Sequence, residues 1–225
     1  MKKSLLLILI AIMFLLTHCA TFKSDMIGKY EKTTGKNYKT KPVSLLLIFS
    51  HYRQTTGWDA IPKLDDQRQR IQGFDDFLAD ALNELSNIKR YSTFTEYASD
   101  VNDPVRRAQK DSLMQQHDYI MKFKFMRKKS FAKSTLGALL SSVSLTLFPI
   151  AYTYNYSLDV ELYDSKGQLL KHYSRKASLT KWVHTLLIFV YPFHPEQCKK
   201  EELYVEFLHD VFKQTEQEKI LQKSN

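Results

Sequence analysis

One short segment in the C-terminal third of the chain contains three residues of types that bind zinc. His194, Glu196 and Cys198 lie within five residues of one another and are all zinc-ligand types. A closed zinc site needs a fourth ligand, which this segment lacks. An exposed turn therefore explains the cluster better, and we predict no metal site.

Three aspartates, Asp75, Asp76 and Asp80, form the other candidate for acid–base chemistry or metal binding. No histidine or second acidic cluster accompanies them in the sequence, so a solvated helix face is the better interpretation. The chain has no Gly-x-Ser-x-Gly motif, no glycine-rich phosphate loop and only six glycines. We expect no catalytic residues and no cofactor. An envelope hydrolase with an unrecognised site is the alternative, and it would need a polar cleft holding an acid or histidine with a perturbed pKa.

The first 18 residues have the organisation of an export signal. Met1-Lys2-Lys3 is a basic head, and 12 apolar residues follow from Leu5 to Leu16. As a helix, this run would cover only ~18 Å of a hydrocarbon core of ~30 Å. It therefore suits a signal peptide better than a membrane span.

The segment Leu16-Thr17-His18-Cys19 resembles the lipobox of bacterial lipoproteins, although the family usually has Gly, Ala or Ser where this chain has His18. The resemblance implies cleavage before Cys19, which would carry diacylglycerol and a fatty acyl chain and anchor the protein to the cell envelope. Ala20 and Thr21 carry no acidic retention signal, which favours the outer membrane over the inner. Secretion without lipid and an uncleaved anchor are the alternatives.

The charge of the chain points to a particular class of partner. It is +9 overall, and +7 once Lys2 and Lys3 are removed with the signal. In an exported protein, this balance favours anionic membrane lipid, cell-wall polymer or an acidic partner. We expect no nucleic-acid binding, because no recognisable motif or basic helix accompanies the charge. With Cys19 lipidated, Cys198 would have no partner for an intramolecular disulfide.

The hydropathy pattern predicts an α+β fold, a mixed sheet covered by helices on one face. We expect a lipidated flexible tether over 19–41, a single domain over 42–217 and a polar tail over 218–225. The element order is β-α-β-α-β, an apolar insert at 134–151, then β-β-α. The strands are expected at 43–49, 91–97, 119–125, 152–163 and 168–174, and the helices at 64–85, from Asp103-Pro104 onward, and at 196–217.

Two short motifs resemble a known domain. Asp118 precedes the alternating strand Tyr119–Phe125, and a later strand ends in the turn Asp164-Ser-Lys-Gly167. This pairing is similar to the periplasmic domain of curli-secretion-type lipoproteins and penicillin-binding-protein activators. The resemblance implies a helix-covered mixed sheet. The uncharged insert departs from a simple activator domain, so the activator function is not carried over.

The apolar insert needs a reason of its own. No charged residue lies between Lys133 and Asp159, and a cluster of cations precedes the insert. Basic residues near an anionic membrane contribute about 1 kcal/mol each. Membrane contact by 127–150, and with it 182–193, is therefore one hypothesis. Packing of both segments in the core or over the sheet is the interpretation that we favour slightly, because apolar stretches are usually core. The membrane-contact candidates are Arg127, Lys128, Lys129, Lys133, Leu136, Leu140, Leu147, Trp182 and Tyr191.

These observations favour a non-catalytic, membrane-anchored envelope lipoprotein, an adaptor or assembly factor that binds another envelope component. The alternative is an oligomeric secretion or pore subunit, which would bind copies of itself and insert 134–150 into the membrane.

Overall fold

A computed structural model describes residues 19–32, 41–65, 74–144, 149–184 and 195–221. The strands are β1 Cys19–Lys23, β2 Val43–Thr56, β3 Lys63–Leu64, β4 Ile88–Glu96, β5 Tyr119–Ser130, β6 Ile150–Asp164 and β7 Leu169–Val183. The helices are α2 Phe74–Leu82, the 3-10 helix η1 Ala98–Asn102, α3 Pro104–Gln115, α4 Phe131–Ser144 and α5 Glu196–Gln217.

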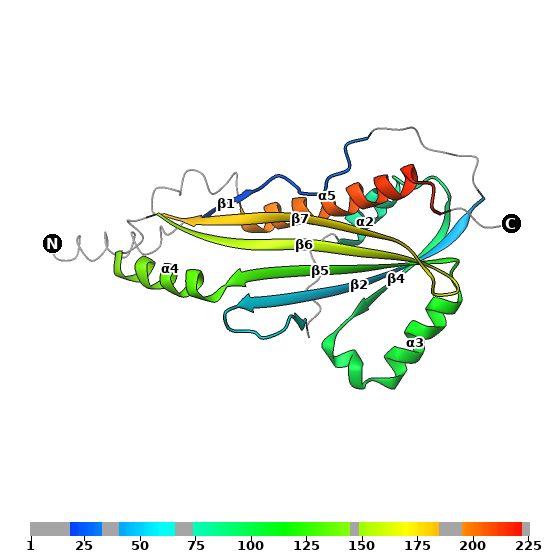
Figure 1. The fold of residues 1–225 in the computed structure, drawn as a ribbon, viewed down its shortest axis with the longest axis horizontal. Coiled ribbons are helices and arrows are strands. Elements are labelled where there is room, and N and C mark those ends of the chain that lie inside the picture. The colour runs from blue at the N-terminus through cyan, green and yellow to red at the C-terminus, as the bar shows by residue number, and fades with distance from the viewer. Residues whose placement is uncertain (1–18, 33–40, 66–73, 145–148, 185–194, 222–225) are drawn as a thin grey trace, which may run out of the picture.

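In the described residues the strands form one seven-stranded mixed sheet, which confirms the predicted α+β class (Figure 1). Its order is β1-β7-β6-β5-β2-β3, and β4 also pairs with β2. Strands β4 and β5 run parallel to β2 on its two sides, whereas the other pairings are antiparallel. The short strand β3 pairs with β2 just beyond the point where β4 ends.

Strand β2 is central because it is apolar on both faces. Eight consecutive residues from Val43 to Ser50 are buried. Leu45, Leu47 and Phe49 belong to the main core beneath α2 and α5, whereas Leu46 and Ile48 belong to a smaller core covered by α3. The prediction that the helices lie on one face is therefore wrong, because a strand that is apolar on both faces needs cover on both.

The remaining predicted elements are present, several of them longer than expected. The alternating face of β5 is confirmed, since Tyr119, Met121, Phe123 and Phe125 all lie in the main core. Helix α3 begins as predicted, with the Asp103 carboxylate accepting hydrogen bonds from the backbone N–H groups of its first turn. The helix predicted over 64–85 is shorter in the structure: Leu64 belongs to β3, and α2 ends at Leu82. Residues 66–73 lie outside the described residues.

The N-terminal segment differs from the predicted tether. Residues 19–23 form β1, which pairs with β7 along its whole length, and Ile27 then makes a β-bridge to Lys176. The backbone N–H of Tyr30 donates to the Asp210 carboxylate. This segment is held because the edge of β7 offers free backbone groups to a further strand. Residues 33–40 of the predicted tether lie outside the described residues.

The predicted polar tail is also partly packed. Leu221 is buried in the main core, with Ile220 packed against it. The side-chain amide of Asn87 donates to the Leu221 carbonyl at 2.5 Å, which fixes the backbone after α5. Two apolar side chains at the start of this segment explain why it packs. Residues 222–225 lie outside the described residues.

A buried ion pair links α5, β7 and the N-terminal segment. Arg175 of β7 is 3% exposed, and its Nε donates to Oδ2 of Asp210 at 2.5 Å. Another guanidinium nitrogen donates to the Gln214 side chain at 2.5 Å. The same Asp210 carboxylate accepts from the Tyr30 backbone. One carboxylate therefore holds three separate parts of the chain together.

We predict that Asp210→Ala lowers the free energy of unfolding by about 3 to 5 kcal/mol, because it leaves the Arg175 guanidinium buried without its counter-charge. Urea unfolding followed by circular dichroism measures this loss. The control is Asp111→Ala, which removes an exposed acid from α3 and should change the unfolding free energy by less than about 0.5 kcal/mol. Equal effects of the two substitutions would contradict the prediction.

Candidate functional site

The apolar insert forms helix α4, and its apolar stripe is exposed. Leu136, Leu139, Leu140 and Val143 are between 54% and 85% exposed. The opposite side of the helix packs on the sheet at Gly137, where an added Cβ would lie 3.0 Å from the Tyr152 ring. Core packing, the interpretation favoured slightly from the sequence, is therefore wrong for the stripe of α4. The larger side chains face outward because only a small residue fits against β6.

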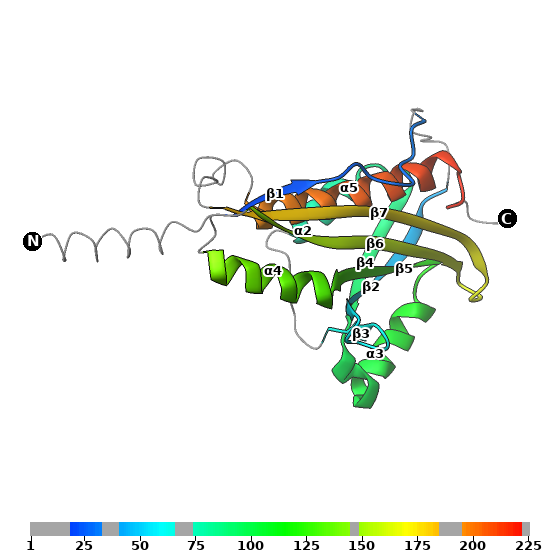
Figure 2. The ribbon, with the colours of Figure 1, turned by 60° about the vertical axis from the view of Figure 1, so that its left-hand side comes forward.

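Helix α4 lies at the end of the sheet where β1 begins (Figure 2). Cys19 pairs with Val183 of β7, and Val183 pairs in turn with Ile150 of β6. Ile150 lies beside Gly137 of α4. With strands about 4.8 Å apart, two strand spacings place the Cys19 backbone about 10 Å from that of Ile150. The predicted lipid attachment point and the exposed apolar helix thus share one end of the molecule.

Lys128, Lys129 and Lys133 lie exposed at this same end, at the end of β5 and the start of α4. No acidic residue occurs between Tyr119 and Leu158. Basic side chains therefore border the apolar stripe of α4 without acidic neighbours from the same stretch. We define Leu136, Leu139, Leu140, Val143, Lys128, Lys129 and Lys133 as the α4 surface.

The other membrane-contact candidates have different positions. Trp182 lies in β7 between Ala20 and Ala151 and is 38% exposed. Arg127 is partly buried and lines a pocket, described below, rather than the α4 surface. Leu147 and Tyr191 lie outside the described residues, as do residues 185–193 of the second predicted segment.

Sequence reasoning missed Trp58, which extends this end of the molecule. It follows β2, is 73% exposed, and stacks on Phe131 at the start of α4 with ring centroids 5.1 Å apart. Ile61 in the same loop is also largely exposed. An isolated tryptophan in a polar loop does not indicate from the sequence that its ring will contact a phenylalanine 73 residues later. Only the parallel pairing of β2 with β5 brings the two rings together.

A pocket opens on the α2/α5 face, where β4 reaches its carboxyl end beside residues 49–53 of β2. In open sheets, this edge is the usual place for ligands. His51, Phe125 and Tyr204 form one wall of the pocket. The His51 and Phe125 rings are stacked 4.9 Å apart, and the Phe125 and Tyr204 rings 4.6 Å apart. Lys200 of α5 and Arg127 of β5 bring positive charge to the pocket.

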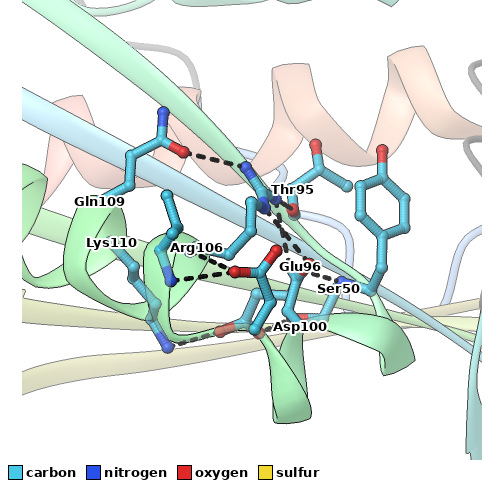
Figure 3. Close-up of polar contacts among 10 residues, drawn as sticks. Ser50, Thr95, Glu96, Asp100, Arg106, Gln109 and Lys110 are labelled. Atoms are coloured by element: carbon cyan, nitrogen blue, oxygen red, sulfur yellow. Dashed lines mark hydrogen bonds and ion pairs between the residues drawn. The ribbon is translucent and has the colours of Figure 1, made fainter.

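Glu96, which also lines the pocket, belongs to a polar network that holds α3 against the sheet (Figure 3). It accepts hydrogen bonds from the Lys110 ammonium and the Ser50 hydroxyl, both at 2.6 Å. Burial alone would raise the pKa of Glu96, but these hydrogen bonds hold it below its ordinary value. Nearby, Arg106 donates to the Thr95 carbonyl and pairs with Asp100. These contacts explain the network as structural support.

His51 is the histidine whose environment most clearly favours its neutral form. Burial, with the charge of Lys200 as a smaller cause, lowers the pKa of His51 from 6.5 to about 4. The ring is therefore neutral at physiological pH, where it serves as part of the aromatic wall. No carboxylate in the described residues pairs with it, so it lacks the partner that would orient it as a general base.

The fold brings a histidine from α5 next to the acidic side chains of α2. His209 of α5 lies 3.2 Å from the Asp80 carboxylate and 3.1 Å from that of Glu84. The contact joins α2 to α5 at a partly exposed position. Among the described residues, no three ligand side chains are grouped so that they could hold a metal. His194 of the sequence cluster lies outside the described residues.

Comparison with known proteins gives little beyond these observations. No family model matches the chain, and no curated protein matches it significantly. The structure resembles the PelC dodecamer from Paraburkholderia phytofirmans, with 11% identity and a TM-score of 0.26, covering 74% of this chain and 83% of that one. It resembles the lipoprotein GNA1162 from Neisseria meningitidis with 11% identity and a TM-score of 0.26, covering 60% of this chain and 83% of that one. Likenesses this small carry no argument about function.

None of the helices in the described part of the chain combines the length and apolar character required to cross a bilayer.

We predict that His51→Phe reduces the acid sensitivity of folding. The His51 pKa is lower in the folded protein than in the unfolded chain, so falling pH protonates the unfolded chain first and destabilises the fold. From pH 7.5 down to about 4, this group costs at most about 3 kcal/mol. Phenylalanine keeps the ring stack and removes the proton uptake.

The measurement is urea unfolding at several pH values for both proteins. Below pH 6.5, the unfolding free energy of the wild-type protein should fall more steeply with falling pH than that of the variant. His172→Gln, which removes an exposed imidazole, is the matched control for loss of a histidine. Parallel wild-type and His51→Phe curves would show that His51 does not titrate as stated.

Proposed function

We propose that this chain is a non-catalytic lipoprotein of the bacterial envelope, anchored through lipid on Cys19 and seated on the membrane through the α4 surface. The observation that carries this proposal is the shared position of two features. Cys19 begins the edge strand β1, and the exposed apolar stripe of α4 lies two strands away at the same end of the sheet. A lipid on Cys19 would bring that stripe to the leaflet.

The shape and charge of α4 suit a helix lying in the membrane interface. Its 14 residues give a length of about 21 Å, and its apolar side chains lie on the side away from the sheet. Lys128, Lys129 and Lys133 would contact anionic headgroups while the leucines enter the acyl boundary. Seating α4 in this way would cover a surface that water otherwise contacts.

An adaptor also needs a surface for another envelope component. Among the described residues, β4 pairs only with β2, so the outer edge of β4 presents its backbone groups to a further strand. Tyr91 on this strand is 46% exposed. A partner could therefore add a strand to β4 and gain contacts from this ring. This edge supports the adaptor role. The outer membrane remains our expected location.

We predict that protein purified from membranes has an intact mass that begins at Cys19 and includes acyl chains. Cys19→Ala should lose the acyl mass and retain the signal, because the modified sulfur would be missing. An unprocessed mass for the wild-type chain would contradict lipidation. In that outcome, any membrane association would have to come from the signal segment or from the α4 surface.

We predict further that a fluorophore at position 143 enters the membrane. The variant Val143→Cys, combined with Cys198→Ser, is labelled with a polarity-sensitive probe and reconstituted as the full chain in vesicles containing phosphatidylglycerol. Its emission should move to shorter wavelength than in detergent-free aqueous buffer. Val105→Cys on α3 is the matched control, since both valines are exposed on helices, at 85% and 74%. Equal emission from the two positions would overturn the seating of α4.

A further inference from the structure

The pocket beside His51 has charged side chains that the proposed membrane function does not use. Three carboxylates line it, and each already has a partner. Asp65 pairs with Arg53 at 3.1 Å, Glu96 pairs with Lys110 at 2.6 Å, and Asp75 takes part in an interaction of its own. The acidic side of the pocket is therefore satisfied within the protein.

Two cations in the same pocket have no carboxylate paired with them among the described residues. Within the described part of the chain, neither Arg127 nor Lys200 has a carboxylate at ion-pair distance, and the nearest acid of α5, Glu196, pairs with Lys181 at 2.8 Å. Arg127 lies beside the Tyr156 hydroxyl, which is neutral. Lys200 lies over the Tyr204 ring, with its Nζ 6.0 Å from the ring centroid. Two cations thus converge on one pocket without a direct ion-pair partner, and the carboxylates of Glu196, Asp65 and Glu201 act on Lys200 only from a greater distance.

Burial and the neighbouring charge of Arg127 hold the pKa of Lys200 below its ordinary value. Holding the charged Lys200 in this buried position beside Arg127 is therefore electrostatically unfavourable. An anion between them would remove the repulsion and form charge-assisted hydrogen bonds to both.

Next to these cations lies a wall suited to an apolar group. His51, Phe125 and Tyr204 form a continuous stack, and Phe74 of α2 contacts its edge through Phe49, with those two rings 5.2 Å apart and perpendicular. Because His51 is neutral, the whole wall is uncharged. A ring or short hydrocarbon chain could lie against it.

We propose that this pocket binds a small amphipathic anion, with its phosphate or carboxylate between Arg127 and Lys200 and its apolar body against the His51–Phe125–Tyr204 wall. The proposal does not depend on lipidation of Cys19 or on the seating of α4.

The ligand could come from the membrane or from solution, and the position of the pocket bears on both sources. Arg127 also lines a neighbouring hollow together with Lys129 and Trp58, which lies toward the α4 surface. An anionic headgroup with its chain and a soluble aromatic phosphate share the chemistry that the pocket recognises. Short water-soluble probes separate the two sources.

The experiment is isothermal titration of the full-chain protein in phosphatidylcholine nanodiscs. The probes are hexyl phosphate, phenyl phosphate, inorganic phosphate and the cation benzylammonium. Hexyl or phenyl phosphate should bind at least about tenfold more tightly than inorganic phosphate, because the apolar body adds contact with the rings. Benzylammonium should not bind. A preference for hexyl phosphate would identify a membrane-derived ligand, and a preference for phenyl phosphate a soluble aromatic one.

Two variants test the residues. Lys200→Gln and Arg127→Gln should each weaken binding of the preferred phosphate about tenfold, with unchanged circular dichroism spectra. Lys199→Gln is the matched control, because this neighbouring lysine of α5 pairs with Glu202 and does not line the pocket. Failure of both organic phosphates to bind, equal binding of benzylammonium, or undiminished binding by both folded variants would each overturn the proposal.

Discussion

Strand β2 must be covered on both faces, and this constraint arranges the rest of the structure. Its eight consecutive buried residues cannot face water on either side, so α2 and α5 cover one face and α3 covers the other. Its parallel pairings with β4 and β5 follow from the crossover helices between them. The same pairings place the pocket at the carboxyl end of β4, and the start of α4 further along, where β2 and β5 end together.

The N-terminal segment changes how lipidation would act. A flexible tether would let the domain move freely above a membrane. Here β1 begins at Cys19 and pairs with β7, and the Tyr30 backbone binds Asp210, so the described part of the segment is fixed to the sheet. A lipid at Cys19 would consequently fix the orientation of the sheet as well as its distance from the leaflet. Orientation matters because the apolar stripe of α4 occupies only one end of the molecule.

The motifs that resemble known lipoprotein domains serve the fold. Asp118 accepts hydrogen bonds from the backbone and hydroxyl of Ser44 at 2.8 Å, which aligns the starts of β2 and β5. Asp164 accepts from the backbone of Lys166 and Gln168 in the β6–β7 turn, and Gly167 there has a positive φ of 79°. Both motifs therefore have a structural role in this sheet.

The sequence by itself determined the elements whose side-chain pattern is local. The alternation in β5, the cap of α3 at Asp103 and the apolar face of α5 are each set by neighbours a few residues apart, so periodicity and capping rules identify them. The uncharged stretch after Lys133 likewise marked α4 as unusual. Periodicity alone could not say which of its faces would meet the sheet.

The tertiary structure decided what depends on distant partners. β1 forms only because β7 offers it an edge, and Trp58 joins the α4 end only through the pairing of β2 with β5. Arg127, expected at the membrane, instead meets Lys200 in a pocket built from six separate segments. The physical reason is the same in each case: these contacts depend on backbone pairing and on space beside the sheet, which no local pattern of residues records.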